Sequence, residues 1–88
     1  MFELIYSSVA NPDLTHDDIS DILVEAREFN LNNNISGCLL FHNNEFIQIL
    51  EGDKKVVQEL FEKIRQDKRH QHVTLLAEEE TSERVFAR

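Results

Sequence analysis

The sequence predicts an α+β fold in which two helices pack on one face of a mixed β-sheet. Four segments have the apolar pattern and flanking turns of strands, and two segments repeat apolar residues at the spacing of an amphipathic helix. Their order is β-α-β-β-α-β, which is the split βαβ, or ferredoxin-like, arrangement. Right-handed crossovers bring the first and third strands side by side at the centre of such a sheet, where we expect them to be parallel.

The first strand and the first helix are predicted from local signals. Residues 2–7 alternate with the period of a strand, and Tyr6 lies on the face that also carries Phe2. Thr15 followed by Asp18 resembles a capping box, so we expect a helix from about residue 16 to 30. Its apolar residues recur at helical spacing: Ile19, Ile22, Leu23, Ala26 and Phe29.

The middle of the chain is predicted to be a β-hairpin. Strands are expected over residues 35–42 and 45–51, because Asn43-Asn44 stands where a two-residue turn would join them. A second helix follows Gly52, and its apolar positions are Val56, Val57, Leu60, Phe61 and Ile64. A last strand is expected over residues 72–77.

The composition indicates one small acidic domain over residues 1–88, since the chain is long enough for one core and too short for a second domain. Its net charge of -8 argues against a nucleic-acid partner. No apolar run approaches the ~20 residues that span a bilayer, and no export signal is present. We therefore expect a cytoplasmic protein without a membrane partner.

Gln48 is the residue that most needs a partner. It lies in the apolar stretch Phe46-Ile47-Gln48-Ile49-Leu50, where an unpaired amide would cost on the order of 1 to 3 kcal/mol. The predicted topology places Tyr6 on the neighbouring strand. If both side chains face the helices, a phenol and an amide meet in the core, which is an arrangement suited to a ligand.

With these residues in this order, the chain resembles the BLUF family of flavin-binding blue-light sensors. The resemblance covers essentially the whole chain. The segments that carry it are Leu4-Ile5-Tyr6-Ser7-Ser8, Arg27-Glu28-Phe29-Asn30, Ile35-Ser36-Gly37, Phe46-Ile47-Gln48-Ile49-Leu50-Glu51-Gly52 and Asp67-Lys68-Arg69-His70. Together these segments are specific, although none would be so alone.

The resemblance implies that the isoalloxazine ring of FAD lies between the two helices, flanked by Ile22 and Ile64. Asn30 would orient the ring, because one amide offers both a donor and an acceptor to its polar edge. Further contacts are expected from the second helix and its end: Lys63 and Asp67 on the ring or ribityl side, and Arg69 and His70 toward the outer chain of the cofactor. These contacts do not separate FAD from FMN or riboflavin.

The resemblance also implies a switch. Gln48 would bridge Tyr6 and the flavin, and the excited flavin would draw an electron and a proton from the tyrosine and return them. The amide of Gln48 is then left with a rearranged set of hydrogen bonds, with no net chemistry. Such a local change becomes a signal to an unknown downstream partner when it biases a bistable element of the protein.

This chain differs from the family pattern in two respects. Members usually continue past the equivalent of Phe86-Ala87 into a fifth strand and C-terminal helices, so the sequence, which stops at Arg88, is expected to be truncated there. That departure affects signal output more than flavin binding. Position 29, commonly polar in the family, is Phe29 here, so one contact to the ring or ribityl chain is expected to be absent.

The sheet face opposite the helices is expected to be apolar. Ile5, Ile47 and Ile49 would lie on it, together with Leu39 and Phe41. A continuous apolar patch seldom stays exposed on a soluble monomer, so we expect a homo-oligomer formed through this face.

An alternative function belongs to another class: a flavin-free, ferredoxin-like module that associates through the uncovered sheet. An enzyme is not expected, because Gly37 and Gly52 are the only glycines and no phosphate-binding loop can be formed. A small flavin-dependent reductase is a weaker alternative, since no nicotinamide site is recognisable. No set of His, Cys and carboxylate residues has the spacing of a metal site.

Overall fold

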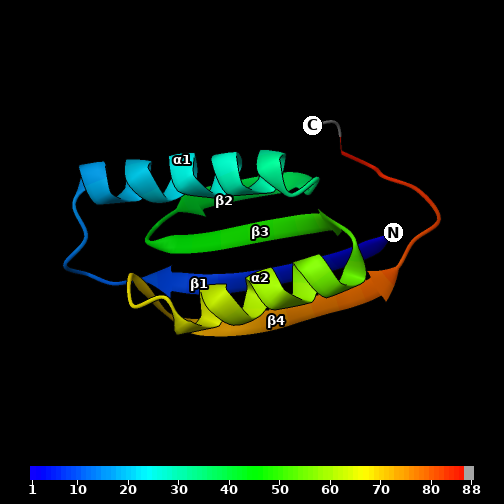
Figure 1. The fold of residues 1–88 in the computed structure, drawn as a ribbon. Coiled ribbons are helices and arrows are strands. Elements are labelled where there is room, and N and C mark those ends of the chain that lie inside the picture. The colour runs from blue at the N-terminus through cyan, green and yellow to red at the C-terminus, as the bar shows by residue number, and fades with distance from the viewer. Residues whose placement is uncertain (87–88) are drawn as a thin grey trace.

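The computed structural model describes residues 1–86 and contains the predicted elements in the predicted order. The strands are β1 (Phe2–Ala10), β2 (Ser36–His42), β3 (Glu45–Gly52) and β4 (His70–Glu80), and the helices are α1 (His16–Asn32) and α2 (Lys54–Gln66). Both helices lie on one face of the four-stranded sheet (Figure 1). The ferredoxin-like fold is therefore confirmed.

The sheet is antiparallel throughout, so the expectation of a mixed sheet with parallel central strands is wrong. The strand order is β2-β3-β1-β4, and every neighbouring pair is antiparallel. The reason is the sequence of reversals along the chain. Helix α1 returns the chain so that β2 runs in the direction of β1, and the hairpin then reverses β3. The adjacency of β1 and β3 at the centre is as predicted.

Local capping and turn signals determine where the elements begin and end. The Thr15 hydroxyl accepts a hydrogen bond from the N–H of Asp18 at 3.2 Å, and the Asp18 carboxylate accepts one from the N–H of Thr15 at 2.9 Å. This is the predicted capping box. In the hairpin turn, Asn43 and Asn44 have φ angles of 50° and 64°. Two successive positive φ angles are the requirement of a type I′ turn, which asparagine tolerates.

The two helices contribute very differently to the core. Helix α2 buries Val57 and Phe61 against the sheet, where they join a cluster that includes Leu4 and Leu50. Helix α1, in contrast, has no buried residue at all. The chain therefore holds α1 over the sheet without filling the space beneath it. None of the helices in residues 1–86 is both long and apolar enough to cross a membrane.

The opposite face of the sheet carries Ile5, Ile47 and Ile49, but the assignment of Leu39 and Phe41 to it is wrong. Leu39 pairs with Gln48, and Phe41 pairs with Phe46, so both share the helix-covered face. The residues of β2 on the opposite face are Cys38 and Leu40, which pair with Ile49 and Ile47. The register between β2 and β3 decides this, because a shift of one residue exchanges the two faces.

Candidate functional site

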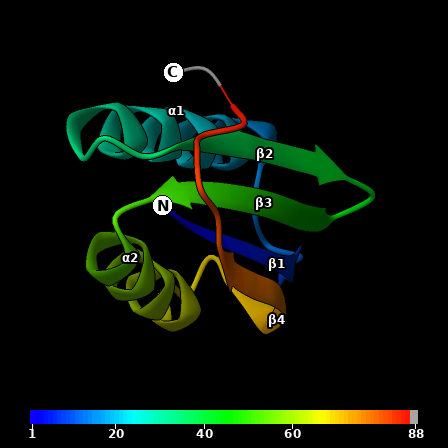
Figure 2. The same cartoon turned by 90° about the vertical axis from the view of Figure 1, so that its right-hand side faces the viewer.

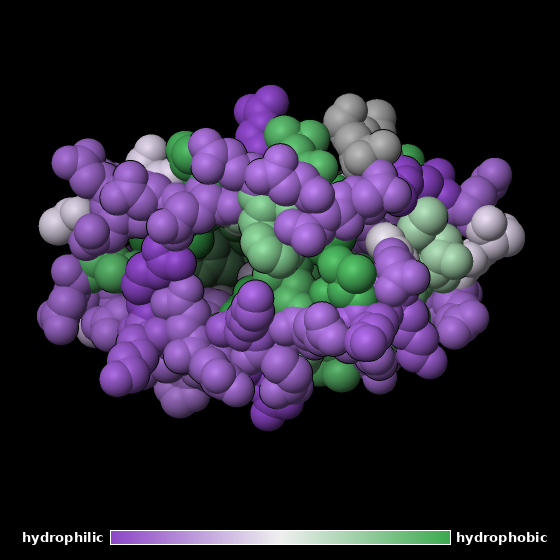
Figure 3. Space-filling model, viewed as in Figure 1, coloured by the Kyte–Doolittle hydropathy of each residue, from purple (hydrophilic) through white to green (hydrophobic). Residues whose placement is uncertain are grey.

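A cavity of about 320 Å³ lies between α1, α2 and the sheet. Figure 3 shows it as a groove with a hydrophobic floor, flanked by the hydrophilic outer surfaces of the two helices. Its lining residues are Tyr6, Ile22, Glu25, Ala26, Phe29, Asn30, Leu39, Phe46, Gln48, Leu60, Lys63, Ile64, Asp67, Arg69 and His70. Every residue that the sequence predicts for the site is among them.

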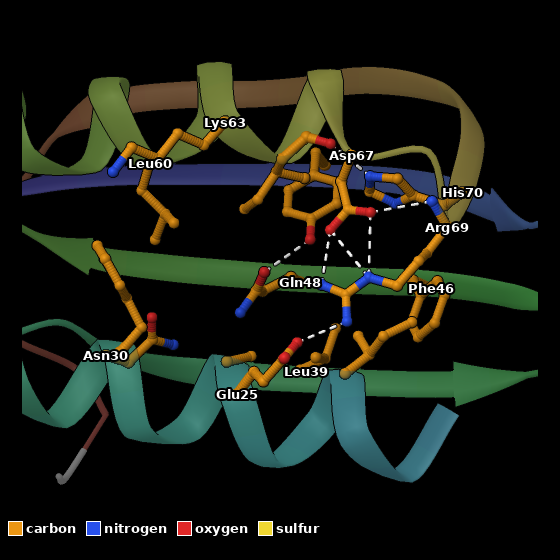
Figure 4. Close-up of a pocket in the computed structure, with 15 residues that line it drawn as sticks. Glu25, Asn30, Leu39, Phe46, Gln48, Leu60, Lys63, Asp67, Arg69 and His70 are labelled. Atoms are coloured by element: carbon orange, nitrogen blue, oxygen red, sulfur yellow. Dashed lines mark hydrogen bonds and ion pairs between the residues drawn. The ribbon is translucent and has the colours of Figure 1, made fainter. Parts of the chain in front are cut away.

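Tyr6 and Gln48 form the floor of the cavity. Their Cα atoms are register partners on β1 and β3, both side chains are buried, and the Tyr6 hydroxyl donates a hydrogen bond of 2.7 Å to Gln48 Oε1. Burial raises the pKa of the Tyr6 phenol well above its usual range, and the negative charge of Asp67 adds to that effect. Tyr6 is therefore a protonated donor, and the Gln48 amide nitrogen remains free to point toward the side of the cavity where Asn30 lies (Figure 4).

The backbone of Asn30 stabilises the end of α1, whereas its side chain faces the cavity. Its carbonyl oxygen accepts hydrogen bonds from the N–H groups of Asn33 and Ile35, at 3.3 and 2.8 Å. Its side chain lines the cavity. Because the structural role uses only the backbone, the side-chain amide is available to a ligand.

An ion-paired network of Glu25, Asp67 and Arg69 crosses the cavity between the helices (Figure 4). Arg69 donates to both carboxylate oxygens of Asp67, through Nε to Oδ1 at 3.1 Å and through Nη2 to Oδ2. Its other terminal nitrogen, Nη1, donates to Glu25 Oε2 at 2.5 Å. The hydrogen bonds from Arg69 hold the pKa of Asp67 below its usual range. The carboxylates of Asp67 and Glu25 in turn raise the pKa of Arg69.

His70 is in the cavity wall, but both of its ring nitrogens are already engaged within the protein. Nδ1 lies 2.8 Å from the hydroxyl of Ser8, and Nε2 lies 2.5 Å from the carbonyl oxygen of Ile64. These contacts connect the end of α2 to β1. His70 thus offers a cofactor the edge of its ring and no free nitrogen.

The helices also meet through Lys63 and Phe29. The Lys63 ammonium lies 5.7 Å from the centre of the Phe29 ring, a distance at which a cation and an aromatic face attract. Phe29 also lines the cavity, as an apolar side chain at the position where the resemblance implies a polar contact. Lys63 and Arg69 lie toward opposite ends of the cavity in Figure 4.

The sequence prediction missed some of the lining residues. Glu25 and Ala26 follow Ile22 at helical spacing, so the period of α1 could have indicated both. Leu60 precedes Ile64 by one turn of α2 in the same way. Leu39 could not have been assigned without the register of β2.

The cavity fits a flat ligand that is mostly apolar and has one polar edge. Its volume is near the lower end of the range of about 300 to 1,000 Å³ for small-molecule sites. That space suits a ring system such as isoalloxazine, and it requires any long substituent to leave through the opening. The polar edge would meet the amides of Asn30 and Gln48, each of which both donates and accepts. The apolar faces would meet side chains of α1 that the protein itself leaves incompletely packed.

Comparisons with known proteins place this chain among light sensors that use a flavin. The family model described as BLUF, sensors of blue-light using FAD, matches residues 1–88. The photoactivated adenylate cyclase subunit beta of Euglena gracilis is 40% identical over 83 residues, which are 94% of this chain. The solved structure of BlsA in its photo-activated state is 41% identical, with a TM-score of 0.90 over 97% of this chain. The dark-state structure of BlrB, a BLUF protein, is 33% identical, with a TM-score of 0.89 over 97% of this chain.

These relatives are longer than the region they share with this chain. The match covers 10% of the Euglena cyclase subunit, 62% of the BlsA chain and 64% of the BlrB chain. The similarity is thus to one domain of the cyclase and to the larger part of the two smaller sensors.

Proposed function

Because this chain belongs to the BLUF family of blue-light sensors that use FAD, we propose that residues 1–88 act as one flavin-binding domain in which Tyr6 and Gln48 are the switch. The observation that carries this assignment is the 2.7 Å hydrogen bond from the Tyr6 hydroxyl to Gln48 Oε1 on the floor of the cavity. A buried phenol and amide that face an open space are what a light-driven exchange of hydrogen bonds requires.

The other lining residues hold the cofactor in this proposal. Ile22 on α1 and Ile64 on α2 lie on the two sides of the cavity and flank the ring. Asn30 orients the polar edge through its side-chain amide. Lys63 and Asp67 line the same cavity and contact the ring or the ribityl chain.

The outer part of FAD leaves the cavity past Arg69 in this proposal. The Arg69 guanidinium is only partly buried and lies at the end of α2, so it can meet the anionic tail once its bond to Glu25 is exchanged. His70 supports this wall through Ser8 and Ile64 and contacts the cofactor only by its ring edge.

Bound FAD supplies the absorption of blue light and an acceptor for an electron. The protein supplies the hydrogen bonds that change. In the structure, Tyr6 donates to Gln48 Oε1, and the proposal assigns this arrangement to the dark state. A rotated or rearranged amide presents the opposite pattern of donor and acceptor to Tyr6, which is a change in the floor of the cavity without any net reaction.

The experiment that tests the function is the visible absorption spectrum of the purified protein in the dark and directly after blue illumination. We expect a flavin band with a small, reversible red shift. A colourless protein that also fails to bind added FAD would contradict the proposal. That outcome would favour the flavin-free interaction module, since this module needs only the fold and the uncovered sheet.

We also propose that the opposite sheet face joins two copies of the chain. Leu40 and Ile47 are 60% and 44% exposed there, beside the partly buried Ile5 and Ile49. Apolar residues grouped in this way are typical of an interface. Light scattering at tens of micromolar protein should give a dimer mass, and Ile47→Glu should give a monomer. Val24→Glu, at an exposed position of α1, is the matched control, and a wild-type monomer would contradict the dimer.

The proposed role is that of a sensor without turnover of its own. The cyclase activity in the name of the Euglena relative belongs to a protein of which this region matches 10%. The downstream partner is unidentified, and the cytoplasmic location stays a prediction. Steady oxidation of a reduced nicotinamide by the purified protein would instead support the reductase alternative.

A further inference from the structure

The residues that follow β4 turn back across the end of the sheet. Figure 2 shows this segment rising from the end of β4, past the ends of β1 and β3, toward the start of β2. It is attached at its beginning, where the N–H of Thr81 donates to the carbonyl oxygen of Met1 at 2.7 Å. It is attached again at Arg84, which donates to the carbonyl oxygen of Asn34 at 3.1 Å. These contacts join positions that are far apart in the sequence.

Glu51 is the centre of the second attachment. Its carboxylate is completely buried, with 0% of the residue exposed. Oε1 accepts hydrogen bonds from the Ser36 hydroxyl at 3.0 Å and from the N–H of Phe86 at 2.8 Å. Oε2 accepts one from the N–H of Val85 at 2.8 Å. Two of its three donors therefore belong to the segment Arg84–Phe86.

Arg84 completes the arrangement from the side of the segment. Its guanidinium donates to the Ser36 hydroxyl at 2.5 Å, and that hydroxyl in turn donates to Glu51. The same guanidinium also reaches the carbonyl oxygen of Glu51 at 3.5 Å. The buried negative charge thus has a positive group within the same network, which a buried carboxylate generally needs.

The carboxylate depends on the segment, and the segment depends on the carboxylate. Burial by itself would raise the pKa of Glu51. The N–H groups of Phe86 and Val85 act in the opposite direction and, with the hydroxyl and guanidinium groups nearby, hold the pKa below its usual range. If the segment left, the charge would lose most of its donors.

Glu51 is also on the strand that carries the proposed switch. It follows Gln48 by three positions on β3, where it pairs with Ser36 of β2 and with Glu3 of β1. On the same strand, Gln48 pairs with Leu39 of β2. The carboxylate of Glu51 joins this strand to the segment Arg84–Phe86.

We propose that Glu51 is a latch that holds Arg84–Phe86 on the sheet, and that this latch loosens when the hydrogen bonds of Gln48 change. The second half rests on the proposed photoreceptor function, whereas the first half is independent of light and flavin. With this latch, the position of the chain after β4 depends on the hydrogen bonds of β3. It assigns a role to Glu51, the glutamate of the sequence Leu50-Glu51-Gly52, which does not line the flavin site.

The test in the dark is amide hydrogen exchange at Val85 and Phe86, measured by NMR on the full chain. In Glu51→Gln we expect exchange at both positions to accelerate at least about tenfold, because an amide replaces a charged acceptor and one of its oxygens is lost. Glu45→Gln, which changes an exposed carboxylate at the other end of β3, should leave both rates unchanged. Protection within β1 and β3 should persist in both variants.

A second variant covers the case in which Glu51→Gln fails to fold. Arg84→Gln lies outside the sheet and the helices, leaves the carboxylate in place, and should accelerate exchange at Val85 and Phe86 severalfold. Unchanged exchange at these two positions in Arg84→Gln and in any folded Glu51→Gln protein would overturn the latch.

The test in the light uses the FAD-loaded protein under blue illumination. Exchange at Val85 and Phe86 should accelerate in the wild type and stay at its dark value in Gln48→Leu. A wild type that shows the red shift but no acceleration would overturn the connection to Gln48. A wild type without the red shift would overturn the photoreceptor function itself, and the dark comparison would still decide the latch.

Discussion

Gln48→Leu is expected to bind flavin and to lose the red shift that light induces in the flavin band. Leucine is close to glutamine in size, so the cavity keeps its shape and its apolar walls. It has no donor or acceptor, so the Tyr6 hydroxyl loses the partner that it has at 2.7 Å in the wild type. An unpaired buried hydroxyl also costs about 1 to 3 kcal/mol, so the variant should unfold at a lower urea concentration.

The measurement is the absorption spectrum before and after blue illumination, together with the molar ratio of flavin to protein. Gln58→Leu, at an exposed position of α2, is the matched control and should keep both the flavin and the shift. A normal red shift in Gln48→Leu would remove Gln48 from the switch. Loss of flavin from this variant would instead assign Gln48 to cofactor binding.

Gly37→Ala is expected to destabilise the fold strongly. Gly37 has φ of 147°, and an added Cβ atom would lie 1.8 Å from the carbonyl oxygen of Ile49. That oxygen belongs to the backbone of β3, so it cannot move without breaking the pairing of β2 with β3. The strained conformation and the overlap together should cost at least about 3 kcal/mol, a large part of the 5 to 15 kcal/mol that typically stabilises a domain.

Urea denaturation of the two glycine variants measures this effect. Gly52→Ala is the control, because its added Cβ would approach the Ile35 side chain no closer than 3.3 Å. We expect Gly52→Ala to lose much less stability than Gly37→Ala, since a side chain can shift by a few tenths of an ångström. Equal midpoints for Gly37→Ala and the wild type would show that β2 pairs differently from the observed register.

The sequence alone determined the elements, because their signals are local. The capping box at Thr15 needs only residues three positions apart, and the hairpin needs only the two asparagines that tolerate positive φ. The sequence also predicted that Tyr6 and Gln48 lie on neighbouring strands, but it left open whether both side chains face the helices, and the antiparallel register makes them partners. A buried amide must have a partner, and the topology offered one.

Other features depended on the tertiary structure. The direction of β3 was mistaken in the sequence prediction because the connection through α1 keeps β2 in the direction of β1 and the hairpin alone then reverses β3. The face of Leu39 was mistaken because register depends on pairing. His70 was expected toward the outer chain of the cofactor, but the partners of its ring nitrogens, Ser8 and Ile64, could be identified only from the fold.

The partners within the two networks of charged residues also depend on the fold, and the sequence did not indicate them. Arg69 bonds to Glu25 across 44 positions of the chain, and Glu51 bonds to Val85 and Phe86 across 34 and 35. A charged side chain has no periodic pattern that indicates its partner, and its position at the surface or in the interior depends on what later folds over it. Local propensities and apolar periodicity therefore determined the elements and the adjacency of the strands that carry Tyr6 and Gln48, whereas only packing decided the partners of these charges.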